Sequence, residues 1–300
     1  MKTTAIKKAK NGIALCISTL VLSGCGSSAD DLPVDQELTP PPKVANTDWP
    51  VIHQNNAGTK DNLRSGPVSA TEEDVDFYET GNTVLMLLGE NYLYHLPNQD
   101  TSIYAFDPNN ISAGPVKQAD MGESFPNLGG GAIDDSGKLW VNVGDRVARL
   151  SEDLSTAVYS QHMQDTIPDT TFPSNNGLVI LSDGNILSSS TVNHAWITSS
   201  TKNNDDEYPV IGHYDFTQFT YQNQAILSDE GVFSPRPIIQ DNDVFIMSAN
   251  YMLKLKYSPE TQTLDQNITW AFKNPENVNS TVSTISISHP VIMGDLVCAA

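Results

Sequence analysis

The sequence predicts an all-β protein, a β-propeller built from four-stranded antiparallel blades. The first observation is the segment 125–150, in which short apolar runs alternate with turns such as Asp135-Ser136-Gly137, a pattern typical of an antiparallel meander. The second is recurrence, because a similar segment begins at Phe172 and its turn glycine Gly184 follows Gly137 by 47 residues. Further strand-turn-strand units centre on Gly89, Asp241-Asn242 and Gly294. A unit that returns about every 50 residues indicates propeller blades.

Residues 1–24 form a predicted signal peptide. Four lysines precede an apolar run, Ile13 to Leu22, that is too short for a mature membrane helix. The tetrapeptide Leu22-Ser23-Gly24-Cys25 that follows resembles the bacterial lipobox, and the resemblance implies cleavage before Cys25 and acyl chains on that cysteine. An ordinary secretory signal is the alternative. The residues after the cysteine, Gly26-Ser27, resemble those of lipoproteins that are sent to the outer membrane. The protein would then face either the periplasm or the cell surface.

Charge and cysteine content limit the partners. The sixteen basic residues include the four leader lysines, so twelve remain against 36 acidic residues, and such a polyanion argues against nucleic acid as a partner. Membrane contact is expected only through the lipid on Cys25. Of the three cysteines, Cys16 would be removed and Cys25 lipidated, which leaves Cys298 without a disulfide partner.

The mature chain divides into a tether and a propeller. Residues 25–47 are rich in Ser, Asp and Pro and are expected to be a disordered tether. Residues 48–300 are assigned to the propeller. Blades are expected at about 83–118, 125–161, 172–227 and 233–273, with an insertion at 194–216 in the third and the beginning of a fifth blade near the end. About four blades and part of a fifth do not close a ring, so the sequence predicts an incomplete, C-terminally truncated propeller.

Several oxygen-rich stretches are weighed as calcium sites. Residues 107–110 lack the dense alternating carboxylates of a calcium loop, so a turn is favoured. Residues 203–207 are the densest oxygen cluster and are expected to form a solvated loop. Asp134 and Asp135 are expected to be hairpin residues. No residue is therefore assigned as a metal ligand.

Glycine and tryptophan positions carry structural expectations. Gly129-Gly130-Gly131 brings backbone close either to a neighbouring strand or to a ligand, and packing is favoured. The segment His194-Ala195-Trp196 is either a ligand-stacking patch or a buried tryptophan with a bonded histidine. Trp270 is expected to pack between blades. His53 is expected to be hydrogen-bonded in a closing seam rather than to act as a ligand.

Two strands resemble the repeats of quinoprotein (PQQ)-like propellers. They are Ile103-Tyr104-Ala105-Phe106-Asp107 and Ile268-Thr269-Trp270-Ala271-Phe272. The entry into the domain, Trp49-Pro50 followed by His53, resembles the start of such propellers. A more distant resemblance links the chain to lactonase (SMP-30-type) propellers.

The candidate ligand-binding residues are those that precede each innermost strand, since these face the ring axis. By register they are Asn127, Asn175, Asn176, Arg236 and His289. The motifs GxSxG, HExxH, the Walker loop and a GxGxxG that opens a helix are absent from the sequence, so hydrolysis through those devices lacks support. No catalytic residue is assigned.

Three functions follow from these resemblances. The first is a scaffold of the cell envelope that binds a protein, peptide or glycan at the ring face without catalysis, as the outer-membrane assembly propeller lipoprotein does. The second is a calcium-dependent lactonase-type hydrolase, for which calcium would be the cofactor, although Arg236 and His289 depart from its Glu, Asn, Asn, Asp ligand set. The third, a quinone-dependent dehydrogenase, lacks the vicinal cysteines.

Overall fold

The computed structural model describes residues 43–45, 78–79, 83–97, 100–123, 130–168, 171–173, 175–190, 193–222, 224–225, 237–247, 251–268, 270–273, 291–293 and 296–298. Cys25, His53, Asn127, Arg236 and His289 lie outside these residues, and for Asn176 only the backbone is described. No helix within the described ranges is long and apolar enough to cross a membrane.

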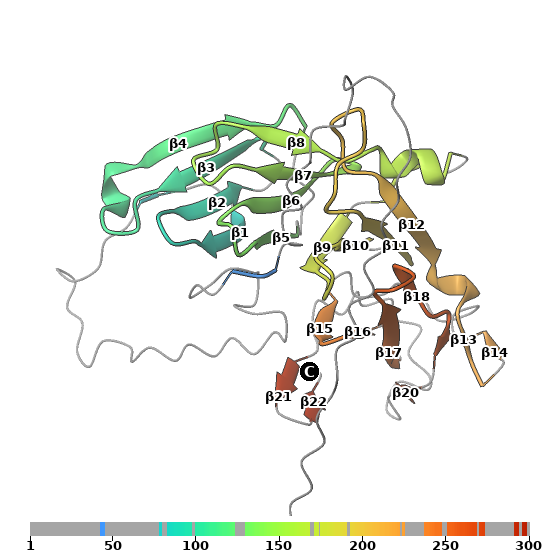
Figure 1. Ribbon diagram of the computed structural model, residues 1–300. Coiled ribbons are helices and arrows are strands. Elements are labelled where there is room, and N and C mark those ends of the chain that lie inside the picture. Colours follow the sequence, from blue (N-terminus) through green and yellow to red (C-terminus); the bar gives the residue numbers. More distant parts are fainter. Residues whose placement is uncertain are drawn as a thin grey trace, which may run out of the picture. The chain divides into compact units, whose positions relative to one another are not determined.

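The first two sheets are four-stranded antiparallel meanders in sequence order (Figure 1). The first contains β1 (Thr83–Leu88), β2 (Leu93–Pro97), β3 (Ser102–Phe106) and β4 (Pro115–Asp120). The second contains β5 (Gly131–Ile133), β6 (Leu139–Val143), β7 (Arg146–Leu150) and β8 (Ala157–Tyr159). The 3₁₀-helix η2 (Ile111–Ala113) lies in the turn between β3 and β4. Both sheets match the predicted blades at 83–118 and 125–161.

The third sheet shows that the predicted insertion in its blade was wrong. It contains β9 (Asn175–Ile180), β10 (Ile186–Ser190), β11 (His194–Thr198) and β12 (Val210–Asp215), again in an antiparallel meander. The segment 194–216, predicted to be an insertion, therefore supplies the two outer strands of the blade. The long polar connection between β11 and β12 concealed their pairing, since hairpin loops are usually shorter. The 3₁₀-helix η3 (Met163–Thr166) precedes this sheet and η4 (Phe216–Gln218) follows it.

The fourth sheet contains β15 (Ile238–Gln240), β16 (Asp243–Met247), β17 (Tyr251–Ser258) and β20 (Trp270–Lys273), and β18 (Thr263–Leu264) pairs with the end of β17. A small sheet joins β13 (Thr220–Tyr221), β14 (Gln224–Ala225) and β19 (Asn267–Ile268), with β13 and β19 parallel. The strands β21 (Val291–Met293) and β22 (Leu296–Cys298) form a hairpin, where the fifth blade was expected to begin.

Trp270 does not pack between blades as predicted, because its side chain is 41% exposed. It lies opposite Lys254 in the pairing of β20 with β17. The buried face of β17 is the other one, where Leu253 and Leu255 join the core shared with the third sheet.

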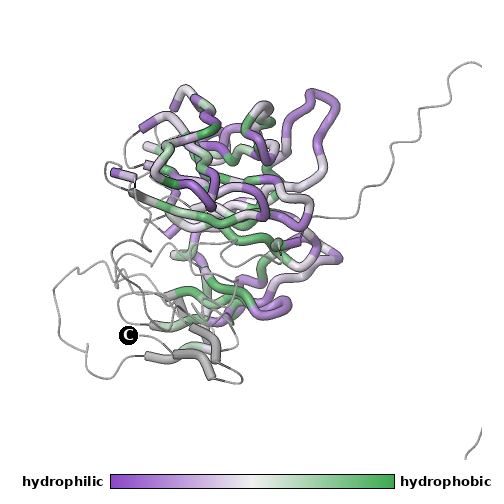
Figure 2. Tube along the Cα trace, turned by 90° about the vertical axis from the view of Figure 1, so that its left-hand side faces the viewer, coloured by the Kyte–Doolittle hydropathy of each residue, from purple (hydrophilic) through white to green (hydrophobic). Residues whose placement is uncertain are grey.

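The core consists of apolar clusters that lie between consecutive sheets. One cluster joins the first and second sheets, one joins the second and third, and one joins the third and fourth. On β9, Leu178 and Ile180 belong to the second cluster whereas Val179 belongs to the third, as the two-residue period of a strand requires. Each fully buried Leu or Ile contributes roughly 1.5–3 kcal/mol. Figure 2 shows hydrophobic and hydrophilic stretches alternating along the described chain.

The first strands of successive sheets are neighbours, since β1 contacts β5 and β5 contacts β9. Sheets that meet along their first strands and pack through both faces have the arrangement of propeller blades. The protein is therefore an all-β propeller whose described sheets do not close a ring, as predicted.

Residues 43–45, assigned above to the tether, pair with the second sheet. Val44 forms an antiparallel bridge with Asp134, and the backbone amide of Ala45 donates to the carbonyl of Ile133 at 2.8 Å. Ala45 is also buried within the first cluster. This part of the predicted tether belongs to the packed domain.

Asp134 is a hairpin residue, as predicted, but its side chain is fully buried. Oδ1 accepts hydrogen bonds from the backbone amides of Ser136 and Lys138 and from the Ser136 hydroxyl. Oδ2 accepts from the Trp140 indole at 2.9 Å and from Nε of Arg149 at 3.0 Å, and it also pairs with Nη2 of Arg149. A buried carboxylate with these hydrogen bonds joins the turn between β5 and β6 to side chains of β6 and β7.

Candidate functional site

The predicted site residues were all expected at one end of the sheets. In a four-stranded antiparallel meander, the start of the first strand, the turn between the second and third strands, and the end of the fourth strand lie at the same end. We call this end the start face. The register of the sequence predicts Asn127, Asn175 or Asn176, Arg236 and His289 at this end. Their grouping stays a prediction, because three of the four lie outside the described residues.

Asn175 is the one predicted site residue whose side chain is described. It begins β9, lies opposite Ser190 at an irregularity in the pairing, and is fully buried. Its Nδ2 donates to Sδ of Met163 at 3.1 Å, while its Oδ1 has no hydrogen-bond partner among the described residues. Asn175 therefore offers an unused acceptor at a buried position rather than an exposed contact for a ligand.

Asn142 on β6 was not singled out from the sequence, although it is a lone amide in the apolar run LWVNV. Its Nδ2 donates to the carbonyl of Gly177 at 3.1 Å, and its Oδ1 accepts from the Ser188 hydroxyl at 3.0 Å. Asn142 thus joins the second sheet to β9 and β10 of the third. These two bonds fix β6 relative to β9 and β10.

Gly130, just before β5, and Gly131, its first residue, confirm the packing interpretation, whereas Gly129 lies outside the described residues. A Cβ added to Gly130 would lie 2.5 Å from the amide nitrogen of Leu178, and one added to Gly131 would lie 2.7 Å from Cδ2 of Leu85. Both distances are shorter than real Cβ contacts allow. The glycines therefore permit the close approach of neighbouring first strands, and no ligand is needed to explain them.

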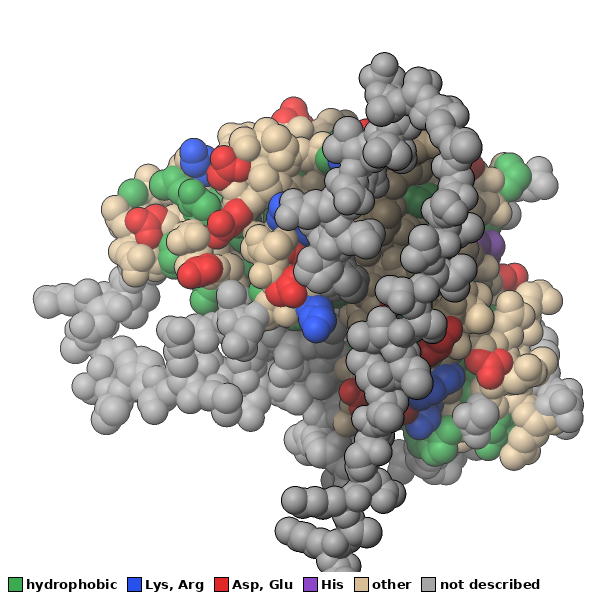
Figure 3. All heavy atoms as spheres, viewed as in Figure 1, with side chains coloured by type: hydrophobic (Ala, Val, Ile, Leu, Met, Phe, Trp, Pro, Cys, Tyr) green, Lys and Arg blue, Asp and Glu red, His purple; other side chains and the backbone are tan. Residues whose placement is uncertain are grey.

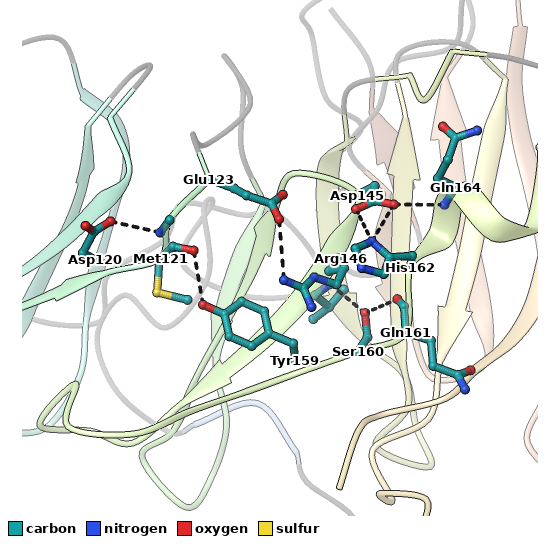
Figure 4. A network of polar contacts seen from close by, with 12 residues as sticks. Asp120, Met121, Glu123, Asp145, Arg146, Tyr159, Ser160, Gln161, His162 and Gln164 are labelled. Atoms are coloured by element: carbon teal, nitrogen blue, oxygen red, sulfur yellow. Dashed lines mark hydrogen bonds and ion pairs between the residues drawn. The ribbon is translucent and has the colours of Figure 1, made fainter. Parts of the chain in front are cut away.

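A cluster of polar side chains lies on the start face of the second sheet (Figure 4). We call it the rim cluster, and it comprises Glu123, Asp145, Arg146, Tyr159 and His162. Glu123 belongs to the connection from the first sheet, Asp145 and Arg146 to the turn between β6 and β7 and the start of β7, and Tyr159 and His162 to the end of β8 and the connection that follows. Three chain segments thus bring these side chains together.

Asp145 orients His162 within the rim cluster. Nδ1 of His162 lies 2.9 Å and 3.1 Å from the two carboxylate oxygens of Asp145. The carboxylate also accepts from the backbone amide of Gln164 at 3.3 Å. The Asp145 side chain is 16% exposed, whereas that of His162 is 49% exposed. The imidazole is therefore held on its Nδ1 side and open to solvent.

Arg146 is held between an aromatic ring and an acid. Its guanidinium carbon lies 4.4 Å from the ring centroid of Tyr159, and Nη2 lies 3.5 Å from Oε1 of Glu123. Its Nε is buried and has no hydrogen-bond partner among the described residues. Gly144 permits this arrangement, because a Cβ there would collide with the Glu123 carboxylate.

The Tyr159 ring packs against the Arg146 guanidinium and is itself held by a hydrogen bond. Its hydroxyl donates to the carbonyl of Met121 at 3.3 Å. Burial raises the pKa of Tyr159 above its ordinary value, the Arg146 charge lowers it, and the carboxylates of Glu123 and Asp120 raise it further. The phenol is therefore neutral across the physiological range and keeps its hydrogen bond.

The rim cluster does not contain an activated nucleophile within the described residues. An Asp-His pair is the orienting half of a catalytic triad, and Ser160 is the nearest hydroxyl in sequence. Ser160 is fully buried, and its hydroxyl donates to the carbonyl of Gln161 at 2.8 Å and accepts from the amide of Val147 at 2.9 Å. These bonds make Ser160 a structural residue.

A second cluster on the start face involves the histidines of the third sheet. Trp196 is fully buried, and its indole donates to Oγ1 of Thr166 at 2.9 Å. The His194 ring lies 5.8 Å from it between centroids, tilted by 36°, and is hydrogen-bonded to His213. The structure thus has the buried tryptophan with a bonded histidine, which was one of the two interpretations of residues 194–196.

The oxygen-rich stretches form turns, as predicted. Oδ1 of Asp107 accepts from the amide of Asn109, and Oδ1 of Asn203 accepts from the amides of Asp205 and Glu207. Nowhere in the described part of the chain do three or more His, Cys, Asp or Glu side chains converge as a preformed metal site. On the face seen in Figure 3, the visible acidic side chains are interspersed with other side chain types.

Comparisons with known proteins find likeness in solved structures only. The β-propeller domain of Cps50 (Swd1) from Myceliophteria thermophila is 10% identical with a TM-score of 0.38, over 62% of this chain and 56% of that one. The Pan2 WD40 domain of Neurospora crassa is 10% identical with a TM-score of 0.43, over 64% and 50%. The Nup133 β-propeller domain of Vanderwaltozyma polyspora is 11% identical with a TM-score of 0.41, over 72% and 64%. The chain thus spans about half to two thirds of these domains. No protein-family model and no curated protein matches it.

Proposed function

We propose that this chain is a quinoprotein-like β-propeller of the bacterial cell envelope, anchored to the outer membrane by lipid on Cys25. It binds a protein, peptide or glycan at the start face and does not catalyse a reaction. The leader and the lipobox-like tetrapeptide support the anchor. The rim cluster is the observation that carries the binding function.

The rim cluster has the chemistry of a recognition surface. Arginine and tyrosine are enriched among the residues that contribute most to binding energy. Arg146 and His162 are held in place by Tyr159, Glu123 and Asp145, so binding would cost little side-chain entropy. The Arg146 side chain is 21% exposed, and a guanidinium suits a carbonyl, carboxylate or hydroxyl oxygen of the partner.

Two variants of the rim cluster test the binding function. The full chain carrying Arg146→Ala or His162→Ala is produced in bacteria and cross-linked to its partner in the cell envelope. The partner captured by each variant is then identified and quantified. Asp205→Ala is the matched control, because it removes an exposed charge from the loop between β11 and β12 at the opposite end of the sheets. We expect capture to fall about tenfold or more in the rim variants and to persist in the control.

Two results would contradict the proposal. A partner that is captured equally well by both rim variants would remove the start face of the second sheet from the function. A rise of several degrees in melting temperature with calcium would favour the calcium-dependent hydrolase instead, since a ligand that binds only the native state stabilises it. The anchor is tested separately by Cys25→Ser, which should release the protein from the membrane fraction.

A further inference from the structure

The two histidines on the outer strands of the third sheet form a close imidazole pair. Nδ1 of His194 lies 3.1 Å from Nε2 of His213, and the ring planes are inclined by 28°. In the pairing of β11 with β12, His194 lies opposite Asp215 and Trp196 lies opposite His213. All four side chains therefore lie on one face of the sheet.

Both imidazoles are available in their neutral form. Each histidine is half-buried, and burial lowers the pKa of both, while the nearby carboxylate of Asp215 opposes this shift. In the observed pair one nitrogen must donate its proton and the other must accept with its lone pair. When the donor ring carries its proton on its other nitrogen instead, both facing nitrogens present lone pairs, and neutral imidazole is a common ligand of transition metals.

The spacing suits such an ion. Zinc binds imidazole nitrogen at about 2.0–2.1 Å, so two nitrogens at a tetrahedral angle lie roughly 3.3–3.4 Å apart. The observed separation is 3.1 Å, and a small outward rotation of the rings would bring the two nitrogens to that spacing. The stacked Trp196 ring, whose centroid lies 5.4 Å from that of His213, holds the pair in place.

Asp215 supplies negative charge beside the pair. Its Oδ1 accepts hydrogen bonds from the amide of Thr217 at 2.9 Å and from the Thr217 hydroxyl at 2.7 Å. These bonds hold the carboxylate at the end of β12, directly across from His194. It stabilises a bound cation through charge without being counted as a ligand.

We propose that His194 and His213 bind one transition-metal ion of the zinc class, with water in the remaining coordination positions. The proposal is independent of the binding function of the rim cluster, which lies on the second sheet. It also differs from a calcium site, because calcium prefers oxygen ligands over imidazole.

Calorimetric titration with Zn²⁺ tests the site on the full chain, purified with a tag that contains no histidine. We expect one ion per chain, and affinity about tenfold or more lower in His194→Gln and in His213→Gln, since each removes one of two protein ligands. His162→Gln is the matched control, because it removes a half-exposed imidazole from the connection that follows β8, and zinc affinity should persist. Unchanged zinc affinity in both pair variants would overturn the proposal, as would absence of binding.

Hydrogen exchange on the unsubstituted protein keeps the test independent of variant folding. Zn²⁺ should slow exchange in β11 and β12 relative to β6 and β7, because a ligand that joins two strands opposes their local opening. Calcium and magnesium should leave the rates unchanged. Slowing elsewhere in the chain, with β11 and β12 unaffected, would place the metal at another site and refute this one.

Discussion

Asp134→Asn should be one of the most destabilising single substitutions in the chain. The carboxylate is fully buried, and its Oδ2 accepts from the Trp140 indole and from two nitrogens of Arg149. An asparagine of the same shape removes the charge and, in either orientation of its amide, directs a donor at existing donors. Arg149, only 17% exposed, would then keep a largely buried charge without its partner.

The expected loss is about 3–5 kcal/mol, the usual cost of removing one partner of a buried ion pair. For a domain of about 250 residues, each kcal/mol corresponds to roughly 2–4 °C in melting temperature. Asp134→Asn should therefore lower the melting temperature by at least about 6 °C. Circular dichroism during thermal and urea unfolding measures both quantities.

Asp243→Asn is the matched control. Asp243 also pairs with two cations, Lys254 at 2.9 Å and Lys256 at 3.0 Å, but its side chain is 25% exposed and those of the lysines are 35% and 59% exposed. Exposed pairs of this kind contribute about 1 kcal/mol or less. If Asp134→Asn were no more destabilising than Asp243→Asn, the role assigned to the buried pair would be wrong.

Three further predictions concern packing and pH. Gly130→Ala should cost roughly 1–3 kcal/mol, because its Cβ would press on the backbone of the next first strand; a neutral effect in urea unfolding would contradict that close approach. Trp196→Ala should cost about 3–5 kcal/mol, whereas the 41% exposed Trp270 should cost much less when replaced, and equal losses would argue against the observed exposure. Burial lowers the pKa of His194 and His213, so their contribution to stability is complete above their ordinary pKa of 6.5 and is lost as the pH falls through the lower folded values. The double variant His194→Gln/His213→Gln should show a shallower decline between pH 7 and 5, and an unchanged decline would refute this assignment.

The sequence predicted the sheets where strands and turns follow one another at short intervals. The first two blades were located correctly because Gly89 and Gly137 mark tight turns between apolar runs. The outer strands of the third blade were missed because an eleven-residue polar connection, 199–209, separates β11 from β12. Trp270 was placed wrongly because alternation along β20 does not reveal which face of a strand the neighbouring sheet covers.

The site was less predictable than the fold. The predicted residues came from a single rule, position before the first strand, and that rule selected Asn175, which is buried. The rim cluster forms because three chain segments come together at one end of the second sheet. No local sequence pattern predicts that these segments lie close in space. Asp145 and His162, for example, are seventeen residues apart and belong to different kinds of loop.

The apolar clusters shared by consecutive sheets also bear on the order in which the chain acquires its structure. Each cluster is completed by segments about fifty residues apart, so the entropy lost in closing these loops is modest for a β-protein. Because a polypeptide is synthesised from its N-terminus, the cluster between the first two sheets can be buried before the later sheets have been synthesised. We therefore expect folding to proceed blade by blade along the chain. The chain should be most vulnerable to proteases while the face of the newest sheet is still exposed.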